Sequence, residues 1–168
     1  VISSKATVGK SNKLFDLISE ILRNSNLNDA ERVKDVLTRY QARIESSVKN
    51  NGSMYAINRL QSYFSKQGMY NELTNGLEYY RFITDLTKNF ETKQKEISDN
   101  LNKVVELLMT KENLIAAITC SKENYAIYTK DLNSFVSSLG SGKPQYQSWN
   151  FNYELKNEGL MAASKVQY

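Results

Sequence analysis

The chain has 168 residues, enough for one domain that buries about two-thirds of its unfolded surface without disulfides or metal. Its single cysteine, Cys120, excludes an intramolecular disulfide, and no stretch approaches the ~18 apolar residues of a membrane-spanning helix. Lysine and arginine outnumber aspartate and glutamate by 22 to 18 without forming a run, which favours a solvated mixed-charge surface over a nucleic-acid-binding one.

The N-terminal part predicts a short strand over residues 1–6 and a helix over 12–23. The helix would bury one apolar face, made of Leu14, Phe15, Ile18, Ile21 and Leu22. Residues 1–6 are too few and too polar for the core of a signal peptide. We therefore expect a protein of a bacterial cytoplasm or an organelle matrix, and not a secreted one.

Residues 28–64 are predicted to form two helices joined at Gly52. Asn28 and Glu31 have the spacing of a capping box, which would start the first helix. One apolar face follows, made of Val33, Val36, Leu37, Tyr40, Ile44 and Val48. Gly52 is the residue type of a left-handed C-terminal cap at positive φ, and Ser53 can cap the second helix. That helix carries Ile57, Leu60 and Phe64.

The middle of the chain reads as a loop followed by helices. Gly68 and Asn75-Gly76 indicate the loop, and helical spacing resumes over 77–90 and 97–108. Residues 113–120 form an apolar, β-branched run that predicts a buried strand, with Cys120 as a small buried side chain. Helical spacing over 125–139 then ends at Gly140.

The C-terminal part predicts a linker over 141–147 and a strand beyond it. Trp149, Phe151, Tyr153 and Leu155 alternate with polar residues, and 160–168 would pair with them as a hairpin. We therefore predict an α+β fold, with long helices packed on a small, mainly antiparallel sheet. Residues 1–140 would form one segment, and 148–168 would start the next β-containing domain.

A set of spaced residues resembles a known family: Gly52, Tyr55, Ala56 and Arg59, followed by Gly68, Glu72 and Gly76. Together they are similar to the central segment of the presequence-protease subfamily of pitrilysin/insulinase-type zinc metallopeptidases. The resemblance implies an internal segment of a large enzyme, built as part of a metallopeptidase-type α/β repeat. The parent would use zinc to degrade short peptides in a closed, two-halved chamber, and this segment would contribute chamber wall and the connection between the halves.

The same resemblance implies a structural joint at Gly52, Ser53, Tyr55 and Arg59. Ser53 stands where the family often has histidine, so the role of that histidine does not carry over. The chain contains no histidine at all, so the family's H-x-x-E-H zinc motif is missing. We expect no catalytic, cofactor-binding or metal-binding residue in this chain, no zinc in it, and no activity from it alone.

Two other functions remain open. One is a stand-alone helical module that presents an apolar groove to a partner helix. The other is a basic nucleic-acid-binding domain, whose binding would weaken with salt. Under the favoured interpretation the partners are the remainder of the parent peptidase and its peptide substrates, with neither nucleic acid nor membrane. A Gly-rich stretch, Gly140-Ser141-Gly142-Lys143, lacks the spacing of a phosphate-binding loop and is interpreted as linker.

Overall fold

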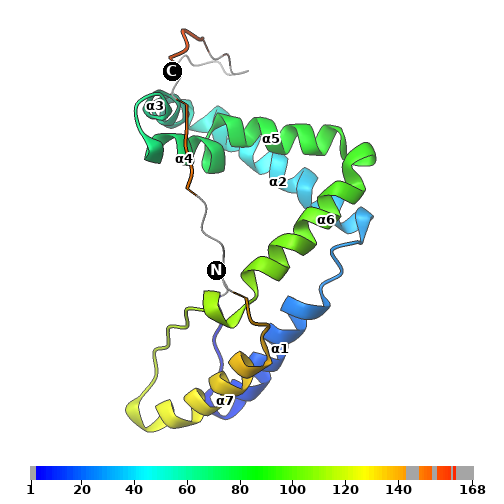
Figure 1. Ribbon diagram of the computed structural model, residues 1–168, viewed down its shortest axis with the longest axis vertical. Helices are drawn as coiled ribbons and strands as arrows, with labels where there is room; N and C mark the ends of the chain where they lie inside the picture. Colours follow the sequence, from blue (N-terminus) through cyan, green and yellow to red (C-terminus); the bar gives the residue numbers. More distant parts are fainter. Residues whose placement is uncertain (1–2, 143–147, 153–154, 160, 162–168) are drawn as a thin grey trace. The chain divides into compact units, whose positions relative to one another are not determined.

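The computed structural model describes residues 3–142, 148–152, 155–159 and 161 (Figure 1). Its α-helices are α1 Ser11–Asn24, α2 Ala30–Asn50, α3 Gly52–Ser62, α4 Lys66–Asn75, α5 Leu77–Lys88, α6 Phe90–Leu108 and α7 Tyr125–Ser138. Short 3-10 turns lie at η1 Val8–Lys10, η2 Lys111–Asn113 and η3 Lys122–Asn124. The chain divides into two compact units. Unit 1 is Val1–Leu27 with Glu96–Tyr146, and unit 2 is Asn28–Lys95 with Gln147–Tyr168.

The predicted α+β fold is wrong, because the described residues are helical and contain no strand. Residues 3–6 and 114–120 lie outside any sheet, as do the described parts of the strand predicted near Trp149. The predicted hairpin partner, 160–168, lies outside the described residues apart from Met161. β-branched and alternating sequences indicate which side of a segment favours burial, but a strand also needs a neighbour to take its backbone hydrogen bonds. The ladder in the described chain is one isolated bridge, between Thr110 and Gly140.

Unit 1 is built around the contact between α1 and α7. Phe15 of α1 stacks on Phe135 of α7, with ring centroids 5.3 Å apart, and lies 5.4 Å from the ring of Tyr128. The Ser11 hydroxyl donates a hydrogen bond to Asp131 across the same pair. The helices predicted over 12–23 and 125–139 are confirmed. Of the five apolar residues assigned to the first of them, Phe15 alone is buried.

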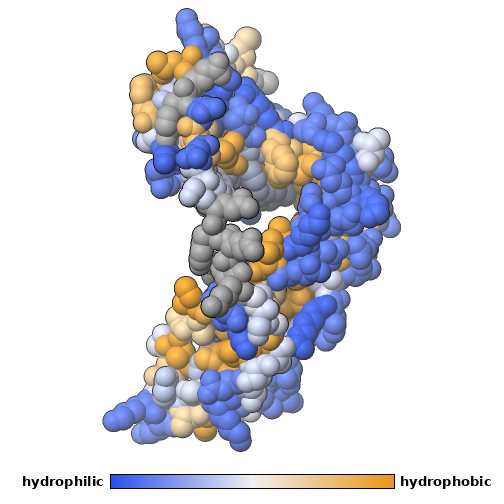
Figure 2. All heavy atoms as spheres, viewed as in Figure 1, coloured by the Kyte–Doolittle hydropathy of each residue, from blue (hydrophilic) through white to orange (hydrophobic). Residues whose placement is uncertain are grey.

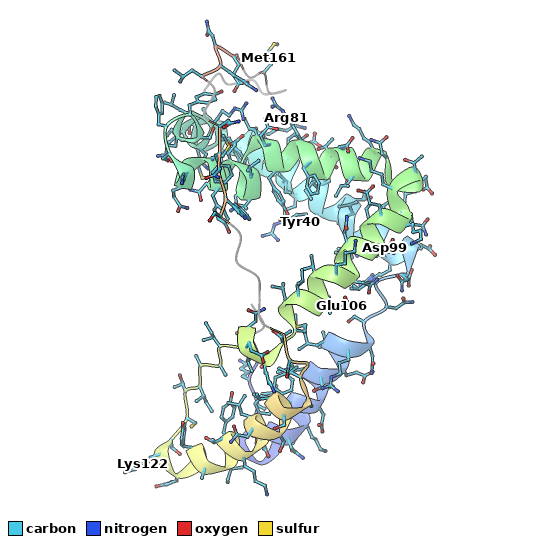
Figure 3. The ribbon with its side chains drawn as sticks, viewed as in Figure 1. Tyr40, Arg81, Asp99, Glu106, Lys122 and Met161 are labelled. Carbon is cyan, nitrogen blue, oxygen red and sulfur yellow. The ribbon has the colours of Figure 1, made fainter. Side chains whose placement is uncertain are left out.

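Unit 2 places α2 beside α5. Tyr40 and Tyr79 meet there edge to face, and their hydroxyl oxygens lie 3.3 Å apart (Figure 3). Burial and this hydrogen bond raise the pKa of Tyr79 to about 12. The cap of α2 is Asp29, which accepts a hydrogen bond from the backbone of Arg32 at 3.0 Å. The capping role predicted for Asn28 therefore belongs to the next residue.

Helices α2 and α3 meet at Asn51, whose φ of −129° and ψ of 36° interrupt the helical path. Gly52 is the first residue of α3, and none of the described glycines has a positive φ. The predicted left-handed conformation of Gly52 is therefore wrong, as is the destabilisation that it implied for Gly52→Val. Ser53 makes no cap bond either, because it already lies inside α3.

The loop predicted around Gly68 and Gly76 is wrong for most of its length, because α4 occupies Lys66–Asn75. Ser65 starts this helix by accepting a hydrogen bond from the backbone of Gly68 at 2.9 Å. The helices predicted after Gly76 are confirmed as α5 and α6, with a break at Asn89. The predicted linker over 141–147 stays a prediction, since 143–147 lie outside the described residues.

Candidate functional site

The strongest concentration of buried charge lies in unit 2, at the side chains of Arg59, Tyr63, Glu72, Glu78 and Glu158, which we call the Arg59 cluster. Arg59 Nη1 donates to Glu72 Oε1 at 3.2 Å and to Glu78 Oε1 at 3.0 Å. Its Nε and Nη2 donate to the two carboxylate oxygens of Glu158, the second at 3.3 Å. Tyr63 also donates to Glu158, and its ring centroid lies 5.5 Å from the guanidinium carbon. One arginine thus connects α3 to α4, to α5 and to the segment 155–159.

Glu72 is the most deeply buried member, with 0% of its surface exposed. Besides the bond from Arg59, its Oε1 accepts a hydrogen bond from the backbone of Glu78 at 3.1 Å, at the start of α5. A buried carboxylate is tolerated only when an opposite charge and hydrogen bonds compensate its lost hydration. Its other oxygen, Oε2, has no partner among the described residues. Arg59 therefore supplies the compensating charge on which this part of the fold depends.

Two glycines make the close approach possible. A Cβ on Gly76 would lie 2.1 Å from Glu72 Oε2, and a Cβ on Gly68 would lie 2.2 Å from the carbonyl oxygen of Gln61. Both distances are far below a van der Waals contact. Gly68 lets α4 pack against the end of α3, and Gly76 leaves space for the buried carboxylate. These glycines therefore serve close packing and not a turn.

Three members of the cluster have shifted pKa values. Hydrogen bonds from Arg59 and Tyr63 lower the pKa of Glu158 from 4.5 to about 2. The hydrogen bond to Glu158 raises the pKa of Arg59, and burial, with the bond to Glu158, raises the pKa of Tyr63. General acids and bases work best with a pKa near the operating pH. Each of these three groups is moved away from neutrality, so the arrangement suits structural pairing better than proton transfer.

The structure brings together some of the residues singled out from the sequence and not others. Arg59 lies at the centre of the cluster, and Tyr55 is buried one turn earlier on α3, with its hydroxyl 3.2 Å from Ser47 Oγ of α2. Tyr55 thus ties α3 back to α2 across the break at Asn51. Ser53 is exposed and contributes nothing to the cluster. Gly52 is half-buried at the start of α3.

Sequence reasoning missed Tyr63, Glu78 and Glu158. Glu158 is 99 residues from Arg59, and no local pattern marks it as a partner. Glu78 carried a detectable signal, because an acidic residue in the first turn of a helix is a common N-terminal feature. That signal indicates the helix start and not the ion pair.

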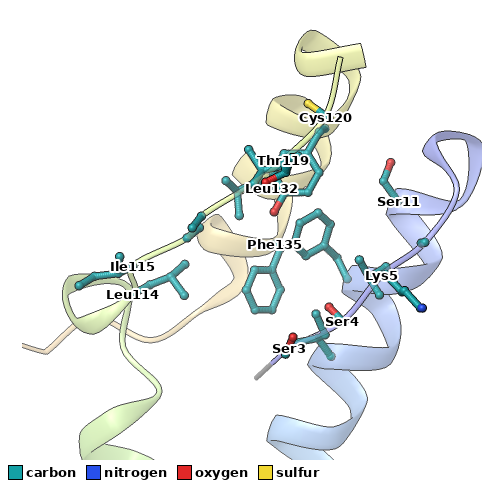
Figure 4. A pocket seen from close by; sticks show the side chains of 18 of the residues that line it. Ser3, Ser4, Lys5, Ser11, Leu114, Ile115, Thr119, Cys120, Leu132 and Phe135 are labelled. Atoms are coloured by element: carbon teal, nitrogen blue, oxygen red, sulfur yellow. The ribbon is translucent and has the colours of Figure 1, made fainter. Parts of the chain in front are cut away.

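Unit 1 contains the main recess of the described chain, a groove of about 900 Å³ (Figure 4). Its walls are α1, α7 and two segments outside helices, around residues 3–7 and 114–121. Lys5 is the one charged side chain among the described residues that line it. Cys120, which the sequence predicted to be buried, is exposed at the groove. A recess lined by a single charged group, a lysine, holds no acid–base pair.

Neither unit offers a metal centre in its described part. No three side chains of histidine, cysteine, aspartate or glutamate gather there in a way that could hold a metal ion. The chain as a whole has no histidine, so it cannot supply the histidine ligands of a zinc peptidase. Among the described residues, we also find no helix with the length and apolar character needed to cross a membrane.

Comparison with known proteins gives the family. A family described as "Peptidase M-16C associated" matches residues 1–86. Protein HypA of Clostridium perfringens is 32% identical over 167 residues, which cover 99% of this chain and 17% of that protein. Presequence protease 1, chloroplastic/mitochondrial, of Arabidopsis thaliana is 22% identical over 169 residues, covering 100% of this chain and 16% of that protein. The mitochondrial presequence protease of Drosophila melanogaster is 25% identical over 143 residues, covering 84% and 13%.

These matches extend over nearly all of this chain but only a small part of each relative. No solved structure matches the chain. The matched range 1–86 contains α1 to α4, most of α5 and, with them, Arg59, Glu72 and both packing glycines. The resemblance drawn from those residues is confirmed. The chain belongs to the peptidase M-16C-associated family and is a presequence-protease-like segment.

Proposed function

We propose that this chain is an internal, non-catalytic segment of a zinc-dependent metallopeptidase that degrades short peptides in a closed chamber. The observation that carries the proposal is the family match over 1–86, together with relatives of which the chain spans 17% or less, two of them named as presequence proteases. The catalytic zinc would be held elsewhere in the parent, because this chain has no histidine.

Within the parent, the segment would contribute chamber wall and the connection between the two halves. The Arg59 cluster supports a role of this kind, because it fastens three helices and a distant segment through one buried guanidinium. Removing one partner of a buried ion pair is strongly destabilising, so such a cluster suits a part that must keep its shape. The compartment would be an organelle matrix or a bacterial cytoplasm, since relatives carry mitochondrial or chloroplast names and one comes from a bacterium.

The test compares the longer parent polypeptide with the 168-residue chain. We expect the parent to cleave a fluorogenic peptide in a reaction that a chelator abolishes and zinc restores, and the chain alone to show no cleavage. In the parent, Arg59→Leu should lower turnover while zinc content, measured by mass spectrometry, stays unchanged. Arg32→Leu is the matched control, because Arg32 lies exposed on α2 and pairs with Asp35 on the surface. Zinc-dependent cleavage by the isolated chain would contradict the proposal.

A further inference from the structure

Helix α3 has the reverse of the usual polarity for a surface helix. Its buried residues are Tyr55, Arg59 and Ser62, which are 6%, 8% and 1% exposed. The opposite side carries Met54, Ile57 and Leu60, and Phe64 follows in the next turn, with exposed fractions of 50%, 56%, 56% and 67%. We call these four residues the outer stripe. Figure 2 shows hydrophobic surface over the region that α3 and α4 occupy in Figure 1.

The spacing of the outer stripe follows the helix repeat. Steps of three and four residues place side chains above one another on one side of an α-helix, and the buried residues fall on the other side. The inner side is accounted for by the Arg59 cluster, in which Arg59 alone makes contacts to three carboxylates. The outer stripe is therefore a second face, and the core of unit 2 does not use it.

Charge makes the same face unusual. Between Gly52 and Ser65 the only charged residue is Arg59, and it points inward. Helices that face water normally carry charged residues on the exposed side, as α2 does with Arg32, Asp35 and Arg39. A helix that is apolar outside and filled on the inside is typical of one buried from both sides. Its missing neighbour should be apolar and uncharged.

We propose that the outer stripe is covered by another part of the same polypeptide, so that α3 lies between unit 2 and a further domain of the parent. The clearest argument for this occupant is length, because this chain makes up only 17% and 16% of two relatives that match it almost end to end. A segment in the same polypeptide also meets the stripe at high effective concentration, which a free partner lacks. The inference rests on the proposed function only in requiring a longer parent.

The experiment measures thiol accessibility in the longer parent polypeptide. Ile57→Cys and Leu60→Cys place a thiol on the outer stripe, and Lys88→Cys places one on the exposed end of α5 as the control. Labelling by iodoacetamide is read at each peptide by mass spectrometry and is expressed relative to the rate in guanidinium chloride. We expect the two stripe thiols to react at least about tenfold more slowly than the control, because covered sites react only through local opening. Equal rates at all three positions would overturn the inference.

A second measurement separates the other occupant. Light scattering of the 168-residue chain over a range of concentrations should show a monomer, and Ile57→Gln should leave its mass unchanged. A dimer that Ile57→Gln dissociates would assign the stripe to a second copy and overturn the inference. Peptide cleavage is measured on the same parent preparation. Protected thiols without zinc-dependent cleavage would refute the proposed function and support the covered stripe, while cleavage with freely reacting thiols would do the reverse.

Discussion

Replacing Gly68 by alanine tests whether the close approach of α3 and α4 holds unit 2 together. The new Cβ would lie 2.2 Å from the carbonyl oxygen of Gln61, 2.4 Å from its carbonyl carbon and 2.9 Å from the nitrogen of Ser62. All three are backbone atoms, so no side chain can rotate away. Since carbon atoms in contact are about 3.5 Å or more apart, α4 must retreat by roughly 1 Å.

Overpacking of this kind costs about 3 kcal/mol at the upper end of its usual range. Alanine returns roughly 1 kcal/mol, because it is the better helix former and position 68 lies inside α4. The expected net loss is therefore about 2 kcal/mol, and at about 2–4 °C per kcal/mol for a chain of this size Tm should fall by roughly 4–8 °C.

The assay is thermal unfolding followed by circular dichroism and by the fluorescence of Trp149. That tryptophan lies 5.9 Å from the ring of Tyr70 on α4, so it reports on the helix that must move. Gly9→Ala is the control, because a Cβ there meets nothing within 4 Å. It should leave Tm unchanged or raise it by reducing the entropy of the unfolded chain. An unchanged or raised Tm for Gly68→Ala would refute the role given to this glycine.

Three further changes test other parts of the fold. Arg59→Leu leaves the carboxylate of Glu72 buried and unpaired, so urea unfolding should show a loss of about 3–5 kcal/mol, and Arg59→Lys should recover only part of it because an ammonium group lacks the fork of a guanidinium. Because the pKa of Glu158 falls from 4.5 to about 2 on folding, its stabilisation is complete above pH 4.5 and lost as the pH falls towards 2. The stability difference between the wild type and Glu158→Gln should shrink across that range, and a constant difference would contradict the ion pair. Phe135→Ala removes a buried ring stacked on α1 and should cost about 3–5 kcal/mol, whereas Ile127→Ala, at an exposed site of the same helix, should change stability by about 0.5 kcal/mol or less.

The sequence by itself determined most of the helices. Those predicted over 12–23, 77–90 and 125–139 agree with α1, α5 and α7 to within a few residues. A helix satisfies its backbone hydrogen bonds within a few residues of chain, so a local apolar repeat is enough to find it. The spaced residues around Arg59 also identified the family from sequence, before their contacts were known.

The tertiary structure alone decided what those spaced residues do. Gly68 and Gly76 looked like turn residues, yet they provide room for packing against Gln61 and Glu72. The apolar run at 114–120 looked like a strand, but the described chain supplies no neighbouring strand for it. Glu158 reaches Arg59 across 99 residues. Sheet pairing, ion pairs and close glycine contacts all join positions that are distant in the chain or on different elements, and a local repeat carries no information about which distant groups will meet.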